Sequence, residues 1–453
     1  MINENITDKL IADLYYLSQS KLPEEILHLA KRSLLDYIGV TIAGANMLNA
    51  KISKLVDSFG KVSGNATLIG QNTKVGIEQA SYINGLSSHV AELDDGVNSG
   101  IVHPGSPVIS ALLSIAELKK IPSKDLLIGI IIGYEATIRL ANAIQPMHKK
   151  RGFHATGTCG TVGASVGIAA MLKYSKAEMK NAFSAAVVSA SGLLKVLEDD
   201  SQLKPFNVAR AANNGLISAL MAKAGFNGPD DVLVGKTGFL AAFSDSYNID
   251  KLNLGVLGKL GIETTYIKPY AACRYCHPAI EAAIKIKSKL LMKDFSNIKD
   301  IEVRTYELAV NNHDHIRVDN VSSSKMSIPF SVAVALVLGK AGINEFSNES
   351  IQNKNIVSLT KNVKVIADEK YTEIFPGKCC AKVIITTNDN KSYTDQVEYP
   401  KGEPENPLTD IELEEKFRSL AMYGNKTEKQ CDNIINHVWN LSDDLSNLFK
   451  SLK

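Results

Sequence analysis

Apolar residues recur at helical spacing through most of residues 1–260. This pattern predicts helices at about 23–38, 76–86, 105–118, 125–144, 177–194 and 209–224. The segment 125–144 is apolar on almost every side, which is typical of a helix buried among others. We therefore expect a large bundle wrapped around central helices.

The pattern changes after about residue 265. Residues 301–308 alternate between apolar and polar, which predicts a strand, and residues 363–366 do so weakly. Two further runs, 382–387 and 391–397, flank Asn388-Asp389-Asn390 and predict a β-hairpin, whereas the apolar segment 329–338 predicts a helix.

Helical periodicity returns after the proline-rich segment 400–407, and we expect this tail to pack back on the first domain. The predicted fold class is therefore mainly α, with a large all-helical domain and a smaller α+β domain. The first domain is discontinuous, comprising residues 1–264 and 400–453, and the second comprises residues 265–399.

Composition excludes several classes of protein. The 453 residues include 50 basic and 48 acidic side chains, and a net charge of +2 gives no electrostatic case for nucleic acid. The longest apolar stretch, residues 126–134, is far shorter than the roughly twenty residues that span a membrane. The N-terminal segment has no secretory pattern and the six cysteines are sparse, so we expect a cytoplasmic protein without a disulfide framework.

The most informative segment carries His89, Glu92, Asp94, Asp95 and His103 directly before a Pro-Gly pair. Carboxylates close to one another and to histidines push the pKa values of these groups apart, so that one group can act as an acid and another as a base. Asp-Asp-Gly is also an ordinary turn signal, so a plain turn stays open. Histidine and aspartate can also bind metals, but these spacings match no compact ligand motif, so we assign no metal.

A second segment, residues 151–163, reads RGFHATGTCGTVG. Its glycines follow GxxGxxG and no strand precedes them, which argues against a dinucleotide site. We interpret it as an anion site in which Thr156 or Thr158 caps a helix and His154 lies in front. Plain helix packing around a buried histidine is the alternative.

Cations gather at two further places. Lys204 lies just ahead of the helix predicted at 209–224, although most lysines are simply solvated. Lys268, Arg274 and His277 bunch at the domain boundary, where they could hold a carboxylate. The same segment contains CxxCH at 273–277, which is formally a haem attachment pattern, but the chain lacks the export signal that this haem requires. The segment also lacks the second pair of ligands that a structural zinc site needs.

Taken together and in order, several segments resemble the 2-methylcitrate dehydratase (MmgE/PrpD) family. They are LLDYIGVTIAG (34–44), HVAELDDGVNSGIVHPG (89–105), GYEATIRLANAI (133–144), RGFHATGTCGTVGA (151–164), AGFNGPDDVLVGKTGF (224–239), KPYAACRYCHPAIEA (268–282), SIPFSVAVALVLGKAG (327–342) and YPKGEPENPLTDIELEEKF (399–417).

The resemblance implies a homodimer whose α+β domain is a lid over the helical domain. The family includes 2-methylcitrate dehydratase, cis-aconitate decarboxylase and iminodisuccinate epimerase, which act on small di- or tricarboxylates without an iron–sulfur cluster. We expect a metal-independent hydro-lyase that needs no cofactor. An epimerase or a decarboxylase on a related diacid is the alternative, and a non-catalytic carboxylate-binding protein is a remote one.

The resemblance also implies the site residues. They are Asp94, Asp95, His103, His154, Lys204 and Lys268. Our mechanistic hypothesis makes His103, oriented by Asp94 or Asp95, the base and His154 the acid. The substrate-binding residues that we predict are Lys204, Lys268, Arg274, His277 and His89, of which the last three come from the residue pattern and not from the resemblance.

Four departures from the family bear on the substrate. Two are the sequence Phe206-Asn207-Val208-Ala209 after Lys204 and, most importantly, Cys-Arg-x-x-His at 273–277. Glu92 stands where the family usually has aspartate, and Phe330 stands where some members have a catalytic tyrosine.

Overall fold

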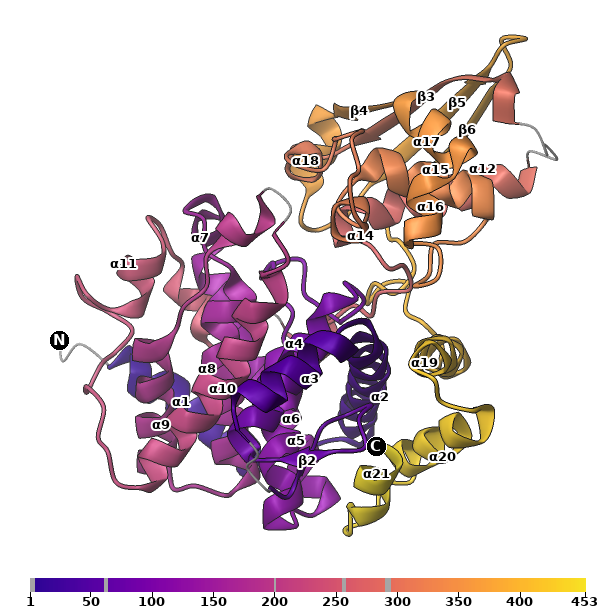
Figure 1. The fold of residues 1–453 in the computed structure, drawn as a ribbon. Helices are drawn as coiled ribbons and strands as arrows, with labels where there is room; N and C mark the ends of the chain where they lie inside the picture. The colour runs from indigo at the N-terminus through magenta and orange to yellow at the C-terminus, as the bar shows by residue number, and fades with distance from the viewer. Residues whose placement is uncertain (1–4, 61–63, 199–200, 255–257, 290–294) are drawn as a thin grey trace. The chain divides into compact units, whose positions relative to one another are not determined.

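The computed structural model describes residues 5–60, 64–198, 201–254, 258–289 and 295–453 (Figure 1). The chain forms two compact units. Unit 1 comprises residues 1–266 and 409–453, and unit 2 comprises residues 267–408. The prediction of a mainly α fold is confirmed, because helices make up most of the described residues.

Unit 1 is built around α8 (Ala155–Met171), which is buried at every position. It packs against α6 (Ser123–Ile144) and α10 (Lys204–Lys223). The other α-helices of the N-terminal segment are α1 (Ile6–Gln19), α2 (Glu24–Met47), α3 (Asn49–Ser58), α4 (Ile77–Val90), α5 (Gly105–Lys119), α7 (Met147–Lys150), α9 (Lys176–Ser189) and α11 (Phe239–Phe243). Short 3-10 helices are η1 (Leu194–Leu197), η2 (Ile249–Leu252) and η3 (Gly261–Thr264).

Small residues let α6 and α8 approach each other closely. A Cβ on Gly163 would overlap the Thr137 side chain and come within 2.5 Å of the Gly133 carbonyl oxygen. One on Gly167 would lie 2.8 Å from the Gly129 carbonyl oxygen. The glycine-rich part of α8 is therefore required by helix packing, the alternative that the sequence left open.

Helix α6 is long and apolar enough to span a membrane by length and composition alone. However, 94% of its most apolar window is buried inside the fold. Such burial is typical of the core helix of a globular unit.

The C-terminal segment packs on unit 1, as the sequence predicts. Helix α19 (Asp410–Tyr423) lies against α2, and it is followed by α20 (Glu428–Trp439) and α21 (Ser446–Ser451) (Figure 1). Lys416 of α19 forms a buried ion pair with Asp36 of α2 and donates to the Leu93 carbonyl at 2.8 Å. This contact ties α19 to the loop that follows α4.

Unit 2 contains a four-stranded sheet in the order β4-β3-β5-β6. Its strands are β3 (Ile298–Thr305), β4 (Val363–Ala367), β5 (Ala381–Thr387) and β6 (Ser392–Val397). β3 runs parallel to β4 and antiparallel to β5, and the predicted β5–β6 hairpin is confirmed. The accompanying helices are η4 (Arg274–Cys276), α12 (His277–Lys289), η5 (Phe295–Asn297), α13 (Glu307–Val310), α14 (Val321–Ser324), α15 (Ile328–Leu338), α16 (Asn348–Gln352), α17 (Lys354–Lys361) and α18 (Glu369–Ile374).

Some expectations were wrong in detail. Unit 1 is not wholly helical, since Ala66–Thr67 (β1) pairs with Lys74–Val75 (β2), and strands of two residues are too short to show periodicity. The helix expected at 177–194 ends at Ser189, because Ala190 has extended backbone (ψ 135°). The helix after Lys204 begins at Lys204 itself.

Candidate active site

The acidic segment lies in the loop of residues 91–104, between α4 and α5. Gly96 donates to the Tyr266 carbonyl at 3.1 Å, which holds the loop against the chain that follows η3. Glu92 (φ 57°) and Ile101 (φ 47°) have left-handed backbone, which residues with a Cβ rarely adopt. The surrounding fold therefore imposes the loop conformation, as is common at functional sites.

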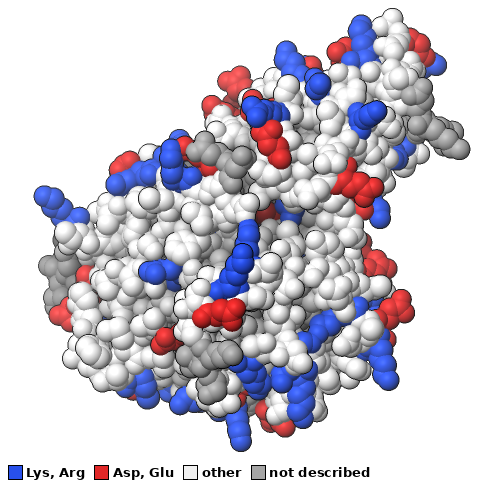
Figure 2. Space-filling view, viewed as in Figure 1, with Lys and Arg blue, Asp and Glu red and all other residues white. Residues whose placement is uncertain are grey.

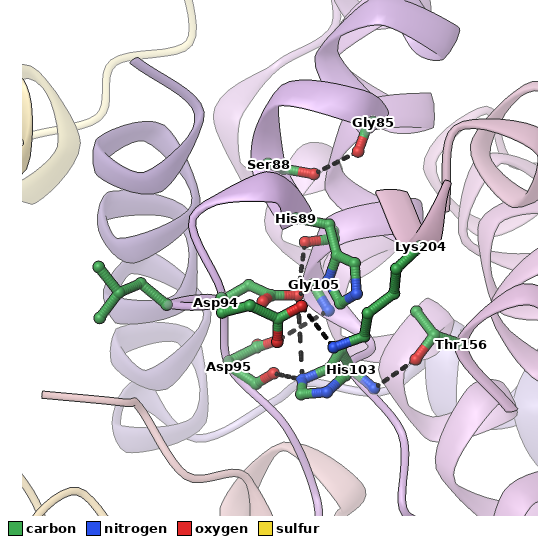
Figure 3. A network of polar contacts seen from close by, with 12 residues as sticks. Gly85, Ser88, His89, Asp94, Asp95, His103, Gly105, Thr156 and Lys204 are labelled. Atoms are coloured by element: carbon green, nitrogen blue, oxygen red, sulfur yellow. Dashed lines mark hydrogen bonds and ion pairs between the residues drawn. The ribbon is translucent and has the colours of Figure 1, made fainter. Parts of the chain in front are cut away.

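Asp94 connects two histidines (Figure 3). Its Oδ2 lies 2.7 Å from His89 Nδ1 and accepts a hydrogen bond from Ser106 Oγ at 2.9 Å. The same oxygen lies 3.9 Å from His103 Nδ1. Because α4 continues to Val90, His89 sits in its last turn and reaches Asp94, with both side chains buried.

Asp95 has different partners. Its Oδ1 accepts from the Gly105 N–H at 3.0 Å, and its Oδ2 accepts from the Tyr134 hydroxyl. Burial, together with the charges of Asp36 and Asp94, raises the pKa of Asp95 to about 7, although the two hydrogen bonds oppose this. The Asp95 side chain thus anchors the loop to α5 and α6 rather than contacting a histidine.

His103 is oriented by a backbone group. The ring Nδ1 of His103 lies 2.5 Å from the Asp95 carbonyl oxygen, and the backbone N–H of His103 donates to Thr156 Oγ1 at 3.1 Å. A carbonyl oxygen only accepts, so Nδ1 carries the proton and Nε2 is the basic nitrogen of the neutral ring. Asp95 thus contacts His103 through its main-chain carbonyl and not through its carboxylate. The His103 side chain is 14% exposed, so solvent reaches it.

His154 is the residue that precedes α8, and its side chain is buried. Asn207 Nδ2 donates to the Leu193 carbonyl at 3.1 Å and lies 3.3 Å from His154 Nδ1. Since this amide nitrogen is a donor, His154 Nδ1 accepts and Nε2 carries the proton. Burial, followed by the electrostatic influence of the neighbouring His89 and Lys204, holds the pKa of His154 well below its usual value.

The predicted threonine cap of α8 was wrong. The capping position belongs to His154, which makes no side-chain cap bond, and Thr156 instead accepts from His103. Thr158 contacts the ring of His148. A capping residue must precede the first helical turn, and both threonines lie inside it.

Lys204, the first residue of α10, forms an ion pair with Glu92 of the loop. The Lys204 side chain is 15% exposed and that of Glu92 is 8% exposed. This contact joins residues 112 positions apart and brings the predicted cation Lys204 to the acidic loop. Unit 1 thus gathers His89, Glu92, Asp94, Asp95, His103, His154 and Lys204, which we call the site cluster.

The remaining predicted residues lie in unit 2. Arg274 forms a buried ion pair with Glu403, and its Nη1 lies 2.9 Å from His277 Nδ1. Lys268 is buried. Arg274 therefore already has a carboxylate partner, and the substrate contacts expected for Lys268, Arg274 and His277 stay predictions.

Sequence reasoning missed three supporting residues, namely Asn207, Tyr134 and Ser106. Each is a buried polar side chain on a helix, and a polar group among neighbouring apolar positions is the signal that could have indicated a buried partner. Among the described residues, no group of three or more His, Cys, Asp or Glu side chains is arranged to hold a metal ion.

The fold and the site cluster define a class of mainly helical, two-unit proteins with acid/base residues on the loop before α5. The model of the MmgE/PrpD N-terminal domain matches residues 12–251, and that of the MmgE/PrpD C-terminal domain matches residues 270–441. The chain therefore belongs to the MmgE/PrpD family.

Several curated relatives share this family. The cis-aconitate decarboxylase-like protein oryM of Aspergillus oryzae is 26% identical over 443 residues, which cover 92% of this chain and 90% of that protein. The cis-aconitate decarboxylase of Aspergillus terreus is 26% identical over 89% of this chain and 87% of its own length. The 2-methylcitrate dehydratase of Salmonella typhimurium is 25% identical over 57% of this chain and 56% of its own length.

Proposed function

We propose that this protein is a lyase that acts on a small di- or tricarboxylate by removing a proton next to a carboxylate. The first candidate reaction is loss of water from a 2-methylcitrate-like hydroxy acid. The observation that carries the proposal is the site cluster itself, in which two histidines with opposite tautomers share one site with a lysine.

His103 is the base of this proposal. Its Nε2 is the basic nitrogen, and it is the more accessible of the two histidines assigned to proton transfer. The imidazolium that forms would be stabilised by Asp94, whose carboxylate lies 3.9 Å from Nδ1. Lys204 would hold a carboxylate of the substrate and stabilise the enediolate that forms when the proton leaves.

His154 is the acid. It must carry a second proton for the substrate hydroxyl to leave as water, and burial disfavours that form in the ligand-free protein. A substrate carboxylate bound nearby would favour the imidazolium. In the dehydration, the C–H electrons then form the new double bond, the C–O bond breaks, and the oxygen takes the His154 proton.

Decarboxylation is the second candidate, because the relatives that match over about nine-tenths of the chain are named as cis-aconitate decarboxylases. There the bond between the substrate and its leaving CO2 would break, and its electron pair would form a new carbon–carbon double bond. The original double bond of the substrate would open, and His154 would protonate its carbon that is not part of the new double bond. The same acid and cation serve both reactions, whereas only the dehydration uses His103 as a base.

The test is an NMR screen in D2O of citrate, 2-methylcitrate, cis-aconitate, tartrate and aspartate-derived acids. Deuterium entering next to a carboxylate with loss of water supports the hydro-lyase, and release of CO2 supports the decarboxylase. A protein that binds none of these acids and exchanges no proton in them would refute the proposal.

We also propose that the functional form is a homodimer. Apolar side chains are exposed around the C-terminal end of α9 and the start of α10, with Val188 70% and Leu203 58% exposed. In Figure 2 the part of the drawn face where α9 and α10 lie carries few charged side chains. Light scattering after size exclusion should give twice the mass of the 49.0 kDa chain, and Leu203→Asp should lower it.

A further inference from the structure

The ion pair between Glu92 and Lys204 occupies the cation that the proposed substrate needs. Both side chains are largely buried, and the left-handed backbone of Glu92 (φ 57°) shows that the fold holds this residue in place. Charge-assisted contacts of this kind are the strong ones, so a ligand must compete with it.

The charges around Lys204 make it harder for a ligand carboxylate to replace Glu92. Within the described site cluster, Lys204 is the only lysine or arginine, whereas Glu92, Asp94 and Asp95 supply three carboxyl groups. His154 adds no permanent positive charge, because its pKa is held well below the usual value. Lys416 is paired with Asp36. An incoming carboxylate thus meets a cation whose charge is already balanced.

We propose that Glu92 is a built-in competitor that occupies the carboxylate position on Lys204 until the substrate displaces it. This deepens the proposed function and rests on it. Since the Glu92 carboxylate stays beside the bound acid, each further negative charge on a ligand is disfavoured. Glu92 is therefore a specificity-determining residue: its charge lowers the affinity for every acid and lowers it more for each further carboxylate, so the tricarboxylates proposed above bind less tightly than they would without it.

The test is calorimetric titration of the full-length protein with succinate and with tricarballylate, which carry two and three carboxylates. Glu92→Gln keeps the shape and removes the charge. We expect it to lower the Kd of tricarballylate by roughly tenfold and that of succinate by roughly threefold. Tighter binding after loss of a site residue is the opposite of what a purely structural role produces.

Two variants keep the outcomes distinct. Glu92→Asp retracts the carboxylate by one methylene and should tighten binding to an intermediate degree, which provides a test if Glu92→Gln does not fold. Lys204→Met should weaken both acids. If Lys204→Met binds them like the wild type, the proposed carboxylate anchor fails and this inference with it. If Lys204→Met weakens binding but neither Glu92 variant tightens it, only this inference is overturned.

Discussion

Replacement of His148 by asparagine should make unit 1 less sensitive to acid. His148 lies in α7, directly before the segment that leads into His154. Its Nδ1 lies 2.9 Å from the Phe243 carbonyl oxygen, and its Nε2 lies 2.9 Å from Thr158 Oγ1. The carbonyl accepts, so Nδ1–H donates and the neutral ring accepts at Nε2 from the Thr158 hydroxyl. A second proton would turn that hydroxyl into an acceptor and place a charge inside the core.

The magnitude follows from the pKa. Burial lowers the pKa of His148 from 6.5 to about 4. Above pH 6.5 the ring is neutral in both the folded and the unfolded chain, so stability is at its maximum. Between pH 6.5 and about 4 only the unfolded chain binds the proton, and the free energy of unfolding falls by about 1.4 kcal/mol per pH unit. The total contribution is about 3 kcal/mol, and it is fully lost near pH 4.

The assay is urea denaturation followed by far-UV circular dichroism at several pH values from 4 to 8. His148→Asn cannot titrate, whereas the other acid-sensitive groups titrate equally in both proteins. At pH 8 the variant should be the less stable one, because it loses part of the buried hydrogen bonding. The gap should shrink by about 3 kcal/mol as the pH falls to 4. A gap that is constant over this range would refute the assigned burial effect.

Three further changes test the site and its framework. His103→Ala should reduce turnover by at least about a thousandfold in the NMR assay while the melting temperature stays close to that of the wild type, and residual activity above a tenth would remove His103 as the base. Asn207→Leu should lower kcat roughly tenfold with little change in KM, because His154 loses the donor that sets its tautomer; an unchanged kcat would contradict that role. Gly163→Ala should cost about 2 kcal/mol or more in urea denaturation, because its Cβ overlaps Thr137 in the α6–α8 contact, and a neutral effect would mean that the helices separate freely.

Local pattern alone determined much of this protein. Helical spacing located α2, α5 and α6, and alternation around a polar turn located the β5–β6 hairpin, because side-chain periodicity and turn chemistry act over a few residues. The loop before α5 could be singled out because histidines and carboxylates are adjacent there in the chain.

Only the tertiary structure decided how the site residues pair. Glu92 meets Lys204 across 112 positions, Tyr134 donates to Asp95 across 39, and Asn207 reaches His154 across 53. Such contacts depend on how helices pack, and no local spacing encodes them. For the same reason the sequence placed the orienting role of Asp95 on its carboxylate, whereas the folded loop directs its main-chain carbonyl at His103.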